Sequence, residues 1–143
     1  MEKTTKSERL NNLYKKYLLN REDVFPLPRG GKLIPIITRT GIDKIQATAK
    51  IKIQFNEIEY TPGISAAVKA TATLNDNKVE SYGEANKSNI NNAYPLAMAE
   101  KRAMSRVVLK LTGFYQLGVF GEDESDTFKK EETVKVLNNK PVK

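Results

Sequence analysis

The sequence predicts an α+β protein in which a three-stranded antiparallel meander packs against a long C-terminal helix. Two observations predict this class. Residues 51–86 contain three segments in which apolar and polar side chains alternate, as they do in half-buried strands. Residues 91–113 then have the period of an amphipathic helix. A short helix before the sheet and an extra amphipathic helix at the N-terminus complete the predicted order.

Residues 1–32 predict an N-terminal helix and a linker. Five apolar residues recur at helical spacing after Ser7, a suitable N-cap: Leu10, Leu13, Tyr14, Tyr17 and Leu18. We therefore expect a helix over about 7–20. Residues 25–32, FPLPRGGK, are rich in proline and glycine and predict a flexible basic linker. Its Gly-Gly-Lys is not a P-loop, because Leu33 stands where the motif has Ser or Thr.

Residues 33–121 form the predicted core. Its first part, 33–38, is a short extended run broken by Pro35, which suits an edge strand. Thr40 is then expected to cap a helix over 41–50.

Three strand-like segments follow, at 51–60, 64–74 and 78–86. In the first, the apolar side chains change parity, which predicts a β-bulge near residues 56–57. The second and third segments carry small residues on one face: Ala66, Ala70, Ala72, Ser81, Gly83 and Ala85. Small side chains leave room for a helix to lie close to that face.

The helix predicted over 91–113 is the most informative stretch of the chain. Asn92 can act as its N-cap, Pro95 suits the first turn, and Gly113 is a natural C-terminal stop. Ala99 and Ala103 fit the small-residue face of the predicted meander. This helix is therefore expected to be the spine of the core.

Four cations follow one side of this helix: Lys101, Arg102, Arg106 and Lys110. Glu100 is the only acid on the helix, so the usual i, i+4 ion pairing is missing and phosphate binding would compensate for the repulsion. Glu100 itself falls within the apolar arc, where an unpaired carboxylate is costly. We expect it to meet a cation from another element or to lie at a subunit interface.

Composition limits the function classes. The chain has no cysteine and no histidine, which removes the usual nucleophile, general base and metal ligands, so we expect no enzyme and no cofactor. The net charge of +7 favours a polyanionic partner. Residues 122–143 are polar and charged and predict a disordered tail. No apolar run is long enough to span a membrane, so we expect no membrane partner and a cytoplasmic location.

The runs ITRTGIDKI, KVESYGEAN and AMAEKRAMSRVVLKLTGFYQLG, within about residues 33–120, resemble the Rad-fifty-two-like superfamily of single-strand annealing proteins. The resemblance implies a core that assembles side by side into rings or filaments, with single-stranded DNA in a basic groove. It also implies contacts to the DNA backbone by Lys101, Arg102 and Arg106. A cation from the strands contributes in that family, and Lys52 and Lys69 are the candidates by their place on the polar face of the strands.

The sequence thus predicts a non-enzymatic protein that binds single-stranded DNA, independent of sequence, in phage-type recombination or replication. Homo-oligomers and other recombination or replication proteins are its expected partners, and strand annealing stays open. One alternative is a double-stranded-RNA-binding module, which has the same α-β-β-β-α order. Its lysines cluster at the start of the last helix, where this chain reads NAYPLA. A second alternative is an interaction protein without nucleic acid.

Overall fold

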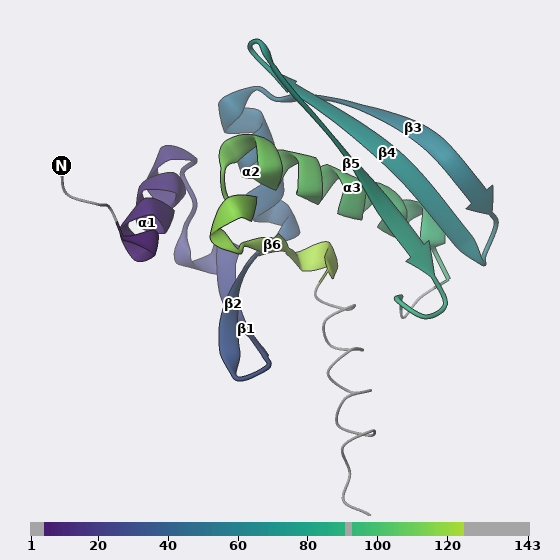
Figure 1. The fold of residues 1–143 in the computed structure, drawn as a ribbon, viewed down its shortest axis with the longest axis horizontal. Coiled ribbons are helices and arrows are strands. Elements are labelled where there is room, and N and C mark those ends of the chain that lie inside the picture. Colours follow the sequence, from purple (N-terminus) through teal and green to yellow (C-terminus); the bar gives the residue numbers. More distant parts are fainter. Residues whose placement is uncertain (1–4, 91–92, 125–143) are drawn as a thin grey trace, which may run out of the picture.

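Two three-stranded sheets and a central helix make up the fold of the computed structural model, which describes residues 5–90 and 93–124 (Figure 1). The predicted order of an N-terminal helix, a short helix, a meander and a long helix is confirmed. The meander lies on one side of the long helix. The short helix and a β-hairpin lie on the other side (Figure 1).

The meander sheet consists of three antiparallel ten-residue strands, β3 (Lys52–Thr61), β4 (Ser65–Leu74) and β5 (Asn77–Asn86), in the order β3-β4-β5. The pairing of β3 with β4 shifts register between Glu57 and Glu59, so the predicted bulge is confirmed. The alternation of β4 is also confirmed. Its even-numbered residues from Ala66 to Ala72 are buried, and the odd-numbered ones form the outer face.

The long helix α3 (Pro95–Thr112) lies against the small-residue face of the meander sheet. A Cβ atom added to Gly83 of β5 would lie 2.0 Å from the carbonyl oxygen of Ala99 and 2.5 Å from the amide nitrogen of Ala103. Helix and strand backbones are therefore in direct contact there, as the small residues predicted. The helix ends at Gly113, which has a φ of 90°. Asn92, the expected N-cap, lies outside the described residues.

A second sheet, the hairpin sheet, replaces the predicted linker. It contains β1 (Val24–Arg29), β2 (Lys32–Ile37) and the two-residue β6 (Phe120–Gly121), in the order β1-β2-β6. Gly30 and Gly31 both have positive φ, which suits a two-residue hairpin turn. The linker prediction for 25–32 was wrong because it treated these glycines as signs of flexibility.

The prolines of the hairpin sheet also fit its topology. Pro26 lies on the edge strand β1, opposite Pro35 of β2. Strand β6 pairs only with Ile36 and Ile37, beyond Pro35. The prediction of an edge strand at 33–38 was therefore wrong for its last residues, where β2 is central. The missing N–H groups of the prolines cost no ladder hydrogen bond to β6.

Both N-terminal helices begin at a threonine cap, two residues earlier than predicted. The hydroxyl of Thr5 accepts a hydrogen bond from the amide of Glu8 at the start of α1 (Lys6–Lys16). The hydroxyl of Thr38 accepts one from the amide of Gly41 at the start of α2 (Arg39–Ala49). Thus Thr5 and Thr38 are the caps, in place of Ser7 and Thr40.

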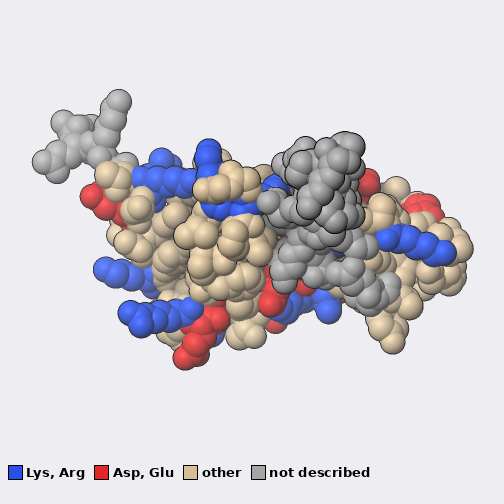
Figure 2. Space-filling model, turned by 90° about the horizontal axis from the view of Figure 1, so that it is seen from below, with Lys and Arg blue, Asp and Glu red and all other residues tan. Residues whose placement is uncertain are grey.

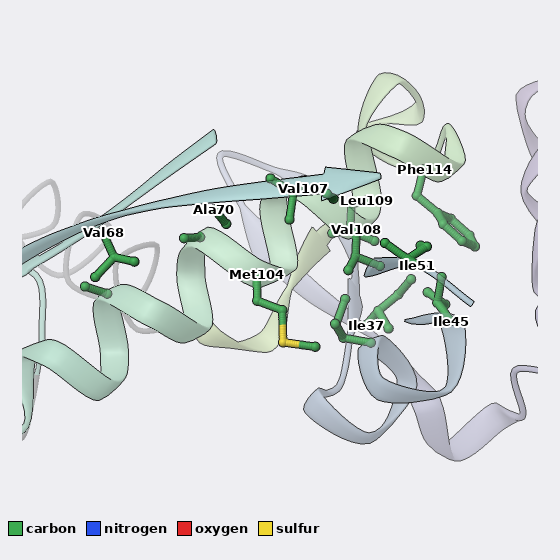
Figure 3. Packing of buried hydrophobic residues seen from close by; sticks show 14 of the residues in the cluster. Ile37, Ile45, Ile51, Val68, Ala70, Met104, Val107, Val108, Leu109 and Phe114 are labelled. Carbon is green, nitrogen blue, oxygen red and sulfur yellow. The ribbon is translucent and has the colours of Figure 1, made fainter. Parts of the chain in front are cut away.

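The core surrounds the C-terminal half of α3 (Figure 3). Val68 and Ala70 of β4 lie on its sheet side, and Ile37 and Ile45 lie on its other side (Figure 3). Because both sides are covered, every residue from Arg102 to Ser105 is buried. The predicted single apolar arc was therefore too narrow for this half of the helix. Glu100 is exposed, so its predicted place within the apolar side was wrong.

The chain after α3 folds back onto the core. Phe114 and Val119 are fully buried. The prediction that disorder begins at residue 122 was wrong, because a 3₁₀ turn, η3 (Glu122–Glu124), packs against α3 and buries Glu124. The remainder of the predicted tail, 125–143, lies outside the described residues.

Candidate nucleic-acid interface

Arg102, at the centre of the predicted cation row, is a buried residue with 1 % of its surface exposed. Its guanidinium donates hydrogen bonds to the carbonyl oxygens of Glu84 (2.8 Å), Asn89 (2.6 Å) and Asp123 (3.1 Å), and to the side-chain oxygen of Asn89 (3.0 Å). The planar fork of arginine suits this convergent set of acceptors. Arg102 therefore does not lie on an open side of α3, as the predicted row of unpaired cations requires. It joins β5, the loop after it and η3 to α3.

Arg106 and Lys110 are also engaged within the protein. Arg106 Nε forms an ion pair with Glu124, and its Nη1 donates to the carbonyl oxygen of Tyr82. Lys110 Nζ lies 3.2 Å from the hydroxyl of Ser81 and 5.3 Å from the ring centroid of Tyr115. The expectation of an unpaired row was wrong, because its acidic partner comes from η3 and not from the helix itself.

Segment η3 brings further acidic groups to this cluster. The Asp123 carboxylate accepts a hydrogen bond from Ser105 Oγ at 2.9 Å and lies 3.8 Å from Arg39. The Glu122 carboxylate accepts one from the backbone amide of Arg39 at 3.0 Å. The acidic run at 122–124, next to an apolar segment that folds back, was the signal in the sequence for this pairing. Of the predicted cations on α3, Lys101 is the one classed as exposed.

The outer face of the meander sheet brings together the two strand lysines that the sequence predicted. The strand register places Lys52 of β3 and Lys78 of β5 on either side of Thr73 of β4. Four residues away on β4, Lys69 lies between Asn56 and Tyr82 in the same manner. Lys52, Lys69 and Lys78 line one groove of about 460 Å³. The rest of its lining consists of Ile53, Gln54, Asn56, Thr71, Thr73 and Glu80.

A second depression extends this groove toward the end of α2. It has a volume of about 400 Å³, and Lys52 and Thr73 line both depressions. Lys50, in the left-handed conformation that ends α2, lines the second one. Lys78 was missed as a site residue, although it shares the parity of the outer-face residues Glu80 and Tyr82. That parity was the signal that could have found it.

The opposite end of the same outer face is acidic. Here Ala67 of β4 lies between Glu59 of β3 and Glu84 of β5. The face is thus basic near α2 and acidic at its far end. A polyanion is attracted to one end and repelled from the other. The other side of the molecule differs, because its blue and red side chains lie beside one another at several places (Figure 2).

A lysine in the N-terminal half is also held by an ion pair. Lys44 Nζ lies 2.7 Å from the carboxylate of Asp23, which belongs to the 3₁₀ turn η1 (Arg21–Asp23). Burial opposes ionisation of Asp23, but a hydrogen bond from the Asn20 amide and the charge of Lys44 outweigh it and lower the pKa. This pair fixes α2 against η1 and lies outside the groove.

Comparison of the chain with protein-family models, curated proteins and solved structures finds no match. The function must therefore be argued from the geometry. Across residues 5–90 and 93–124 no group of three or more acidic side chains could hold a metal ion. No helix in this described part of the chain is long and apolar enough to cross a membrane.

Proposed function

We propose that the basic end of the outer meander face binds the backbone of single-stranded DNA, independent of sequence. One observation supports this above all: three lysines from three strands line one groove, and Glu80 is the only acidic residue that lines it in the described part of the chain. Lysine is a mobile point charge that exchanges water for phosphate oxygens without a fixed geometry. Such contacts bind any sequence and weaken with added salt.

The uncharged residues of the groove support the same function. The hydroxyls of Thr71 and Thr73 can donate hydrogen bonds to phosphate oxygens between the lysines. Tyr82 lies opposite Lys69 and is 51 % exposed, so its ring can stack on a base while the lysine holds the backbone. Stacking of this kind needs an unpaired base, which favours a single strand over a duplex.

This proposal moves the interface from helix α3 to the sheet. Arg102 is excluded from it by burial, and Arg106 by its ion pair with Glu124. Lys101 is exposed and can extend the basic surface. A role in recombination or replication, assembly into a homo-oligomer, and partnership with other recombination or replication proteins are kept in the proposal. They rest on the resemblance of the sequence to single-strand annealing proteins.

A filter-binding titration tests the proposal. Single-stranded DNA, duplex DNA and duplex RNA are compared across a series of salt concentrations. Three phosphate contacts predict a log–log slope of about −2 and a loss of roughly 20-fold in affinity between about 50 and 200 mM salt. Equal or tighter binding of duplex RNA would favour the double-stranded-RNA-binding module. No binding of any of the three would favour an interaction protein without nucleic acid.

A further inference from the structure

Strand β3 has one free edge. It pairs only with β4, and its other edge pairs with no strand of the described chain. Helix α3 packs mainly under β4 and β5 and leaves β3 at the rim of the sheet (Figure 1). A long, unpaired edge strand is a template for pairing with another chain.

Apolar side chains are exposed along this edge. Phe55, Ile58 and Tyr60 of β3, and Ile64 in the turn that follows the strand, are between 36 % and 58 % exposed. They make up half of the large apolar side chains that are exposed in the described part of the chain. Clustered exposure of this kind marks an interaction surface, whereas single exposed apolar residues are ordinary.

At the other edge of the same sheet, main-chain acceptors are occupied. On β5, the carbonyl oxygens of Tyr82 and Glu84 accept hydrogen bonds from Arg106 and Arg102. These arginines thus occupy main-chain acceptors of the β5 edge. None of the hydrogen bonds found among the described residues occupies the β3 edge in this way. The free edge of the sheet is therefore β3.

The sequence of β3 is complementary to itself in the antiparallel direction. The strand begins with Lys52 and carries Glu57 and Glu59 in its second half. If a two-fold axis passes through Phe55, Gln54 lies opposite Asn56 of a second copy. The bulge after Glu57 adds one residue, so Lys52 then lies opposite Glu59, on the same outer face. The Lys52–Glu59 ion pair and the Gln54–Asn56 pair each form twice because of the symmetry.

We propose that two copies of this chain pair antiparallel along β3, with Phe55 facing its symmetry mate, and form one continuous six-stranded sheet. The paired Phe55 rings supply the apolar contact beneath the sheet. On the outer face, Lys52 of each copy forms an ion pair with Glu59 of the other. Charge complementarity selects the antiparallel arrangement, since parallel in-register pairing would place Lys52 against Lys52. This dimer forms without DNA, and Lys52 takes part in both proposed contacts.

Cysteine cross-linking tests the position of the axis. The native chain has no cysteine, so Phe55→Cys introduces a single thiol per chain. Residues directly opposite across antiparallel strands lie within reach of a disulfide. Mild oxidation of Phe55→Cys should give a covalent dimer rapidly, whereas the control Tyr82→Cys, exposed on β5, should not. No dimer at position 55, or equal dimer at both positions, would overturn the proposal.

Charge exchange tests the same pairing with the apolar contacts intact. Sedimentation velocity over a range of protein concentrations should show a monomer–dimer equilibrium for the native chain. Glu59→Lys should weaken the dimer severalfold, because each lysine then faces Lys52 of the other copy. Adding Lys52→Glu should restore it. A native chain that stays monomeric, or a double variant no better than Glu59→Lys, would contradict the proposal.

These outcomes are separate from those of the DNA titration. Glu59 is not among the groove residues, so weakening the dimer through Glu59→Lys leaves the three groove lysines in place. Circular dichroism of each variant distinguishes loss of the dimer from loss of the fold. A dimer without DNA binding would leave the β3 interface standing and remove only the proposed function.

Discussion

The arginines of α3 and the lysines of the meander sheet are both cations, but the structure uses them in opposite ways. Arg102 and Arg106 donate to carbonyl oxygens and carboxylates of their own chain. Lys52, Lys69 and Lys78 line a groove open to a ligand. The difference shows that a row of positive charge on a helix is not by itself a binding surface, because a distant acidic segment can neutralise it.

Side-chain chemistry explains this division. A guanidinium presents five donors in a rigid plane and can satisfy several fixed acceptors at once, as Arg102 does. An ammonium group is strongly hydrated and is usually kept at the surface. The predictions below test this division, from the largest expected effect to the smallest.

Arg102→Ala should lower the free energy of unfolding by about 3–5 kcal/mol, since it leaves several buried acceptors without their donor. Urea denaturation measures this loss. The neighbouring exposed residue supplies the control, and Lys101→Ala should change stability by less than about 0.5 kcal/mol. Similar losses for both variants would show that Arg102 is not a structural residue.

Gly83→Ala should lower the free energy of unfolding by up to about 3 kcal/mol, because the added methyl group collides with backbone atoms of α3. Thermal unfolding followed by circular dichroism measures the effect. Glu84→Ala, at the next and exposed position of the same strand, should be nearly neutral. A stable Gly83→Ala variant would mean that α3 lies further from β5 than the structure shows.

The double variant Lys69→Ala with Lys78→Ala should bind single-stranded DNA roughly tenfold more weakly, with a salt slope shallower by about 1.4. Its fold should be unchanged, because neither side chain is buried. The control Lys15→Ala with Lys32→Ala removes the same charge from exposed sites outside the meander sheet. If both double variants bound equally well, net charge and not the groove would govern affinity.

Asp23→Asn should have the smallest effect and lower the free energy of unfolding by about 1 kcal/mol at neutral pH. It tests whether the ion pair with Lys44 stabilises the fold, as the arginine contacts of α3 do. Burial raises the pKa of Asp23, but the hydrogen bond from the Asn20 amide and the charge of Lys44 lower it by a larger amount. The pKa of Asp23 in the folded protein therefore lies below the usual 3.8. The stabilisation from this carboxylate is therefore present above about pH 4 and is lost as pH falls through the folded pKa.

Urea midpoints from neutral to strongly acidic pH measure this dependence. The native chain should lose stability below about pH 4 more steeply than the Asp23→Asn variant, and the two curves should converge at the acidic end. Parallel curves throughout would show that the Asp23 carboxylate contributes nothing to the pH dependence.

Local patterns in the sequence predicted much of the fold. The period-two alternation of β4 and the small residues of β5 predicted the meander and the close contact with Ala99 and Ala103. The hairpin sheet was missed because proline and glycine were taken to interrupt regular structure. An edge strand and a two-glycine turn accommodate both residue types.

The candidate site divides in the same way. Lys52 and Lys69 were found because strand parity alone decides which face a side chain occupies. The surroundings of Arg102 and Arg106 could not be predicted from the helix alone, since their partners Asp123, Glu124 and the carbonyl of Glu84 come from other parts of the chain. Periodicity describes one helix at a time and contains no information about what covers its second side.

The sequence by itself determined the α+β class, the polar outer face of the meander and the surplus of positive charge. Only the tertiary structure decided which cations are free. Residues 120–124 return to α3 and cover the side that a two-layer arrangement would leave in water. The carbonyl of Asp123 and the carboxylate of Glu124 accept hydrogen bonds from Arg102 and Arg106 in partly buried surroundings. An ion pair on the exposed side of a single helix would leave more of the guanidinium donors in water. The basic groove therefore remains with the lysines of the sheet.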